Sequence, residues 1–172
     1  MLSEINPFYE SDGNNIIDVG GVGFNKYIEI LKPLHIEYII KTDNDLRKYK
    51  EKYSVLGFSR CNKIIGKSVL PTKRIDENSI GAKRSLYESN KEKIDKIRNE
   101  NKVFLSKVDL ENDLDEILHE KLVKYLKTTD PVGYLQDSKS FNMEKLVEKL
   151  TSKDCKCIYE SYNFECLKEV LK

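Results

Sequence analysis

The sequence predicts an α/β protein in which a parallel, Rossmann-like sheet is flanked by helices and followed by a helical C-terminal part. Two observations carry this prediction. The apolar run at residues 16–19 is followed by apolar residues at helical spacing and then by a second apolar run at 36–42. This order indicates a parallel pair of strands joined by a right-handed crossover. From residue 113 onward, apolar residues recur at helical spacing almost to the end of the chain.

The first half of the chain contains one clear helix and two motifs that resemble nucleotide-binding loops. The helix at residues 24–31 should stop at Pro33, because proline cannot continue a helix. Gly20, Gly21 and Gly23 lack the spacing of a dinucleotide-binding loop, so a close-packing turn is the stronger interpretation and nucleotide binding the weaker. Residues 48–79 read as irregular and basic, and their cations, among them Arg60 and Arg74, form either a solvated loop or a phosphate-contacting surface. Their Gly-Lys-Ser sequence has Cys61 where a P-loop would begin with glycine, so no ATPase is predicted.

The second half reads as one more strand among helices. We expect a long surface helix at 81–101, a strand at 103–105, a helix at 114–126 and a loop at 128–140. Asn142 and Asn163 stand where they could cap two further helices. The whole chain, residues 1–172, is predicted to be a single domain whose residues 1–15 are irregular and whose residues 113–172 are mostly helical.

Composition sets the broad class of protein. The 172 residues carry 30 basic and 29 acidic side chains, for a net charge of +1. Such a balance argues against a purely electrostatic nucleic-acid binder and leaves room for a local basic patch. The four cysteines form no C-x-x-C pair, and the sequence shows neither a signal peptide nor a membrane span. Reduced thiols and a cytoplasmic location are therefore expected.

The most informative stretch is the end of the second apolar run. It passes directly into Asp43, Asn44 and Asp45, hereafter the DND motif. Ligands of open α/β sheets gather beyond the carboxyl ends of the strands, and two carboxylates there can hold Mg²⁺. Paired metal ions are a common solution for phosphodiester hydrolysis. The alternative is a simple turn, because Asp and Asn both favour turns.

The DND motif is followed by the segment VDLEND, which contains Glu111, and later by DSKSFNM, which contains Lys139. This ordered set resembles the C-terminal Toprim domain of the OLD (overcoming lysogenization defect) family of ATP-dependent endonucleases. The resemblance implies a Toprim-like sheet and a metal-dependent DNA endonuclease. Asp43, Asp45 and Glu111 would bind Mg²⁺ or Mn²⁺, and Lys139 would stabilise the charged phosphate. It also implies DNA and an ATPase domain or subunit as partners.

Alternatives remain at several of these positions. Glu111 could be an acidic residue favoured by a helix N-terminus, and Lys139 could be an exposed loop lysine. The family pattern also opens with a strand and a glutamate-bearing glycine turn, whereas Glu4 and Glu10 lie in a polar stretch. We therefore expect weak or absent cleavage by this chain alone. The alternative function is a catalytically incomplete fragment or partner subunit that acts through protein interaction. Glu111 is predicted to lie near the DND motif.

Overall fold

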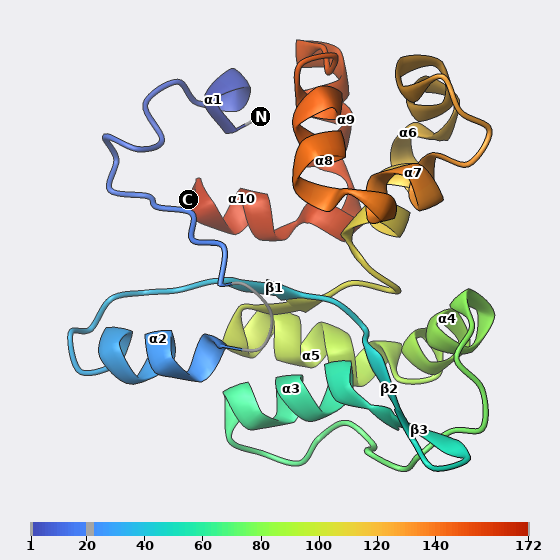
Figure 1. Cartoon of the computed structure of the whole chain (residues 1–172). Helices are drawn as coiled ribbons and strands as arrows, with labels where there is room; N and C mark the ends of the chain where they lie inside the picture. The colour runs from blue at the N-terminus through green and yellow to red at the C-terminus, as the bar shows by residue number, and fades with distance from the viewer. Residues whose placement is uncertain (1, 20–22, 172) are drawn as a thin grey trace. The chain divides into compact units, whose positions relative to one another are not determined.

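The computed structural model describes residues 2–19 and 23–171 (Figure 1). The chain forms two compact units. The first comprises residues 16–109, and the second comprises residues 1–15 together with 110–172. Of the predicted glycine turn, Gly20 and Gly21 lie outside the described residues. Among the residues described, no helix has both the length and the apolar character needed to cross a membrane.

The first unit is built around two short parallel strands. Strand β1 (Ile40–Thr42) pairs with β4 (Val103–Leu105), so that Ile40 lies opposite Val103 and Thr42 opposite Leu105. All three residues of β4 are buried. A continuous apolar strand buried on both faces is typical of a parallel sheet. The α/β class and the strand at 103–105 are therefore confirmed.

The partner of β1 is not the one that the sequence predicted. Residues 16–19 form no strand, and Ile16 and Ile17 are exposed over 68% and 55% of their surface. The strand predicted at 36–42 is also shorter, because residues 36–39 have no regular structure. Local apolarity led to both errors, because Ile16, Ile17 and Ile36 are exposed in the folded protein. The parallel crossover runs instead from β1 to β4.

The crossover contains more regular structure than the sequence indicated. Helix α2 (Phe24–Leu31) ends before Pro33 as predicted. Residues 48–79, predicted to be irregular, contribute most of an antiparallel hairpin and a helix. The long helix predicted at 81–101 is two helices. These elements are β2 (Leu46–Tyr49), β3 (Lys52–Val55), α3 (Leu56–Ile65), α4 (Ile80–Glu88) and α5 (Lys91–Asn101).

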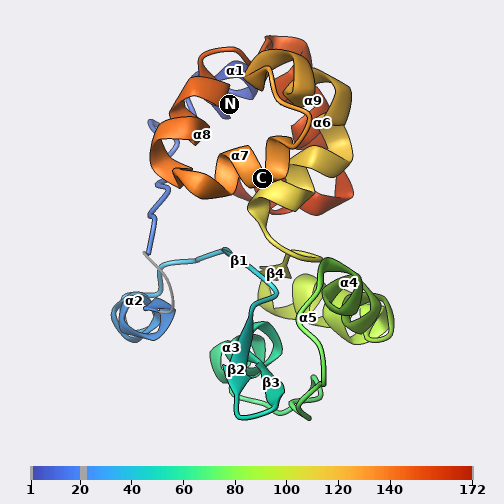
Figure 2. The ribbon, with the colours of Figure 1, turned by 45° about the vertical axis from the view of Figure 1, so that its right-hand side comes forward.

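Helices α3 and α5 pack against β4 and enclose the core of the first unit (Figure 2). Helix α3 contributes Phe58, Cys61 and Ile64, which recur at helical spacing and are buried. It ends at Gly66, whose φ of 69° lies in the left-handed region that favours glycine. Burial of the Cys61 thiol raises its pKa to about 12, so this cysteine is an inert core residue.

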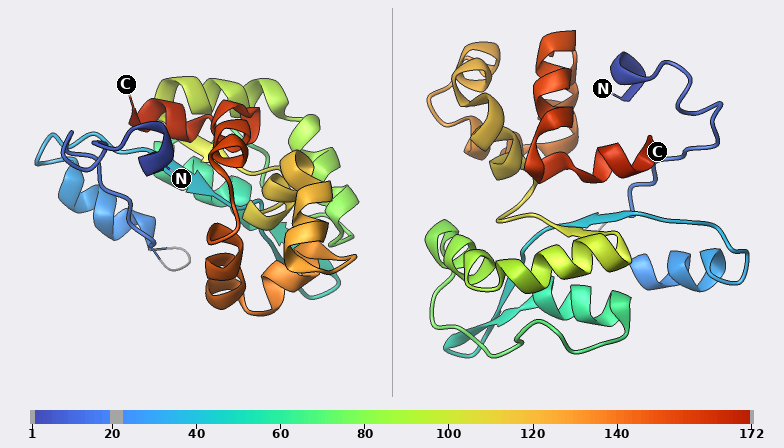
Figure 3. Two further views of the ribbon diagram at one scale, coloured as in Figure 1. Left: turned by 90° about the horizontal axis from the view of Figure 1, so that it is seen from above. Right: turned by 180° about the vertical axis from the view of Figure 1, so that it is seen from behind.

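The second unit is helical, as predicted for the C-terminal part (Figure 3). Its core gathers leucines of several helices around Leu122 and Leu135. The loop predicted at 128–140 is wrong, because Asp130 caps a helix that begins at Pro131. The helices are α1 (Leu2–Ile5), α6 (Leu110–Leu126), α7 (Pro131–Asp137), α8 (Lys139–Val147), α9 (Ser152–Glu160), the 3₁₀ helix η1 (Tyr162–Phe164) and α10 (Cys166–Val170).

A buried carboxylate joins two of these helices. Asp154 in the first turn of α9 forms a capping box with Thr151 and accepts hydrogen bonds from Lys121 and Tyr125 of α6. Burial alone would raise the pKa of Asp154. The hydrogen bonds from Lys121, Thr151 and Tyr125 outweigh burial and hold that pKa well below its usual range. Asp154 is therefore a charged structural link within the second unit.

Candidate metal centre

The DND motif lies at the carboxyl end of β1. The backbone N–H of Asn44 donates to the carbonyl of Val108 at 2.9 Å, so the contact with the chain after β4 continues beyond the strands. The Asn44 side chain is fully buried and donates to the carbonyls of Lys83 and Lys107, each at 3.1 Å. Asp43 and Asp45 are only partly buried. Asn44 therefore anchors the motif, and the two aspartates on either side of it remain accessible.

The first turn of α3 lies directly against this motif. The backbone N–H of Gly57 donates to the carbonyl of Asp45 at 3.1 Å. A Cβ atom at Gly57 would lie 2.8 Å from both the Asn44 Cα and the Asp43 carbonyl oxygen. Real Cβ atoms essentially never approach backbone that closely. Glycine at position 57 therefore permits the close contact that supports the two aspartates.

Arg60, one turn further along α3, holds the motif through its guanidinium group. Its Nη2 donates to Asp45 Oδ2 at 2.6 Å, and its Nη1 donates to the Thr42 hydroxyl and to the Asp43 carbonyl at 3.5 Å. The Arg60 side chain is 11% exposed and that of Asp45 44%. A charge-assisted pair of this kind fixes the Asp45 carboxylate and offsets its negative charge. A metal ion at Asp45 would share the carboxylate with Arg60 or displace it.

The sequence indicated Arg60 only as one of several basic residues of an irregular segment, and its contact with Asp45 was not predicted. The sequence does indicate the helix that carries Arg60. The apolar residues Phe58, Cys61 and Ile64 recur at helical spacing, which places residues 56–65 on a helix. Lys41, which also flanks the motif, donates to the Ser106 hydroxyl at 3.0 Å.

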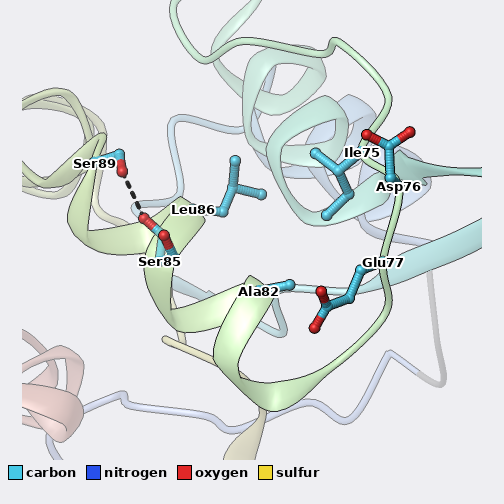
Figure 4. Close-up of a pocket in the computed structure, with 7 residues that line it drawn as sticks. All are labelled: Ile75, Asp76, Glu77, Ala82, Ser85, Leu86 and Ser89. Carbon is cyan, nitrogen blue, oxygen red and sulfur yellow. Dashed lines mark hydrogen bonds between the residues drawn. The ribbon is translucent and has the colours of Figure 1, made fainter.

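Two surface hollows of the first unit differ in charge. One, of about 360 Å³, lies between residues 75–77 and α4 and carries Asp76 and Glu77 but no basic side chain (Figure 4). The other, of about 210 Å³, lies between α2 and α3 and carries Arg60 and Lys63 but no acidic side chain. Of these two hollows, the second has the charge to receive a phosphate group, and it shares Arg60 with the DND motif.

The remaining two predicted site residues meet in the second unit. Glu111 lies in the first turn of α6 and is 1% exposed, and its Oε1 is 3.0 Å from the Lys139 Nζ. Its other oxygen, Oε2, is buried and has no hydrogen-bond partner among the residues described. Lys139 is the first residue of α8 rather than a loop residue. Asn142 lies inside α8 rather than at its N-cap, and its Nδ2 donates to the Tyr134 carbonyl at 2.6 Å.

The predicted ligands are thus found as two groups, one in each unit. Asp43 and Asp45 belong to the first unit and Glu111 to the second, so their predicted proximity stays a prediction. Within the described part of either unit, no three His, Cys, Asp or Glu side chains gather closely enough to hold a metal ion.

Comparison with known proteins shows what part of this chain is similar to. Residues 1–45, which include the whole DND motif, match the model of the Toprim domain of overcoming lysogenization defect protein-like proteins. The resemblance that the sequence predicted is confirmed.

A curated relative is similar over a longer stretch of the chain. The chain is 41% identical to Endonuclease GajA of Bacillus cereus (strain VD045), over an alignment that is 184 residues long with its gaps. The alignment covers 99% of this chain and 32% of the relative. The chain therefore spans about a third of the length of the curated relative that it matches.

Proposed function

We propose that this chain is the metal-dependent nuclease domain of an OLD-type ATP-dependent endonuclease and that it hydrolyses DNA phosphodiester bonds. One observation carries the proposal. The DND carboxylates lie at the carboxyl end of a parallel strand. The chain that carries them aligns over 99% of its own length with part of an endonuclease, at 41% identity. Open α/β sheets bind their ligands at this end of the strands.

Asp43, Asp45 and Glu111 are the proposed ligands of Mg²⁺ or Mn²⁺. Carboxylate oxygens suit both ions. The buried Oε2 of Glu111, which has no hydrogen-bond partner among the described residues, fits a ligand atom whose partner is a cation. When bound, such ions supply Lewis-acid stabilisation of the phosphate and an activated water molecule.

Two basic residues are assigned supporting roles. Arg60 keeps Asp45 in a fixed orientation through its 2.6 Å contact and places a positive charge beside the site. Lys139 contacts Glu111, and its side chain is 57% exposed. We assign Lys139 to the phosphate, where a fixed positive charge stabilises the negative charge that develops in the transition state.

ATP hydrolysis is assigned to a part of the protein or a subunit beyond these 172 residues. The relative is about three times as long as the region that it shares with this chain, which leaves room for an ATPase. DNA is the proposed substrate, and the ATPase is the proposed partner.

The proposal is tested first by metal binding. The purified chain should bind Mn²⁺, measured as loss of the free-ion signal in electron paramagnetic resonance. It should also nick supercoiled plasmid slowly with Mn²⁺ or Mg²⁺ and stop in EDTA. A chain that binds no Mn²⁺ at millimolar concentration would refute the metal centre. Nicking that persists in EDTA would point to a reaction that needs no metal.

The role of Lys139 is tested by substitution with glutamine. Lys139→Gln should reduce metal-dependent nicking by about 10- to 100-fold, because a charge that stabilises the transition state is removed. Mn²⁺ binding should change little. The matched control is Lys145→Gln on the same helix, whose ammonium stacks on the Phe141 ring at 3.9 Å. Equal nicking by both variants would show that Lys139 only neutralises Glu111.

A further inference from the structure

The β2–β3 hairpin starts at Leu46, directly after the DND motif, and has two unlike faces. Residues that lie opposite each other in an antiparallel pair share a face. Leu46 and Val55 are such a pair, and both pack into the core of the first unit. The pairs Arg47–Ser54 and Tyr49–Lys52 alternate with it and therefore occupy the other face. Arg47, Tyr49 and Lys52 are exposed there.

A neighbouring segment adds a further cation to this face. Ile75 forms a β-bridge with Tyr53, with backbone hydrogen bonds of 2.7 and 2.9 Å. The bridge brings Arg74 beside the hairpin, where its guanidinium lies 3.8 Å from the centre of the Tyr49 ring. Lys50 in the turn approaches the same ring at 6.0 Å. The hairpin patch is defined by these exposed residues: Arg47, Tyr49, Lys50, Lys52 and Arg74.

The patch is basic although the chain is nearly neutral. The patch has four basic side chains, Arg47, Lys50, Lys52 and Arg74, and the acidic Glu51 adjoins it in the turn, whereas the whole chain carries 30 basic and 29 acidic side chains. The acidic neighbour Asp76 pairs with Lys52 at 3.0 Å, but the two side chains are 84% and 55% exposed. Such an exposed pair is weak and easily exchanged for another anion. The positive charge is therefore concentrated on this face of the hairpin, and the exposed ion pair leaves it accessible to an anionic partner.

We propose that the hairpin patch binds the phosphate backbone of duplex DNA and brings the strand to the DND motif. This inference rests on the proposed nuclease function. Guanidinium and ammonium groups bind phosphates whatever the base sequence, so the contacts would position DNA without reading it. The Tyr49 ring restrains the flexible Arg74 side chain by a cation–π contact and so presents its guanidinium to a phosphate. Because Leu46 adjoins Asp45, a backbone held here lies next to the proposed metal ligands.

The test measures DNA binding without cleavage. Binding of a fluorescein-labelled duplex is followed by anisotropy in EDTA, at several salt concentrations. The triple variant Arg47→Gln, Lys50→Gln, Arg74→Gln should bind about tenfold more weakly at about 0.1 M salt. Its log–log salt dependence should be shallower by about one unit for each phosphate that the variant no longer binds. A control removes the same charge elsewhere, through Lys93→Gln, Lys96→Gln and Lys153→Gln, and should bind within about twofold of the parent chain.

A second pair of variants tests the role of the ring. Tyr49→Ala should weaken binding because Arg74 is no longer restrained, whereas Tyr49→Phe keeps the ring and should bind like the parent. Circular dichroism must show native helix content in each variant. Binding by the triple variant equal to that of the control would overturn the inference, and so would a parent chain that binds no duplex. If the patch is required but the chain neither binds Mn²⁺ nor nicks DNA, the inference stands and the nuclease function fails.

Discussion

Replacing Asp43 and Asp45 together with asparagine is expected to abolish Mn²⁺ binding and to reduce metal-dependent nicking at least about 100-fold. Asparagine keeps the size of each side chain and removes the charge that a divalent ion requires. The buried Asn44 that anchors the motif is untouched, so the backbone should keep its position. Paramagnetic resonance of Mn²⁺ and gel analysis of plasmid nicking provide the two measurements.

The control must distinguish the loss of a metal ligand from the loss of the Asp45–Arg60 ion pair. Asp45→Asn leaves the nearly buried Arg60 without its 2.6 Å carboxylate partner, which can destabilise the unit on its own. Asp43→Asn alone keeps that ion pair and should still abolish most metal binding. The control Glu88→Gln and Glu92→Gln removes two charges from exposed side chains at the end of α4 and the start of α5 and should change nothing. Full nicking by Asp43→Asn would exclude Asp43 as a ligand.

Each proposed ligand group already contains an oppositely charged partner within its own unit. Arg60 pairs with Asp45, and Lys139 pairs with Glu111. A metal ion bound to these carboxylates, as proposed, would have to share them with Arg60 and Lys139.

The sequence predicted those parts of the fold where burial and apolar pattern coincide. β4 is apolar and fully buried, and the C-terminal helices carry leucines at helical spacing, so both predictions were correct. The run at residues 16–19 is apolar at three of its four positions, but Ile16 and Ile17 are exposed and the predicted strand is absent. Helix α3 was missed because Ser59, Arg60 and Asn62 stand between its buried residues. The polar composition of this segment suggested a loop, whereas the helical spacing of its buried residues indicates a helix.

The candidate site was predictable as a set of residues but not as a set of contacts. The place of Asp43 and Asp45 after an apolar run indicated these two residues, and the resemblance to the OLD family implied Glu111 and Lys139. The structure brings the last two together. The contact of Arg60 with Asp45 joins the end of a strand to the second turn of a helix. It depends on the hairpin that lies between them. Long-range packing of this kind cannot be read from local periodicity.

The close approach of α3 to the DND motif makes Gly57 the most sensitive position of the first unit. Gly57→Ala should lower the free energy of unfolding by about 2–4 kcal/mol, because its Cβ would meet backbone atoms that have no room to move. To relieve the clash, α3 must move away from Asp43 and Asn44. Mn²⁺ binding should therefore weaken together with stability. Denaturant unfolding followed by circular dichroism measures the first effect, and paramagnetic resonance measures the second.

Gly81 provides a matched control, because it is the second residue of α4 as Gly57 is the second residue of α3. A Cβ at Gly81 would meet only the Ser79 hydroxyl oxygen, at an ordinary 3.7 Å. Gly81→Ala should therefore raise the free energy of unfolding by about 0.4–1 kcal/mol, since alanine loses less conformational entropy in a helix. Its Mn²⁺ binding should equal that of the parent chain. Equal stability of the two alanine variants would show that α3 does not hold the DND motif through Gly57.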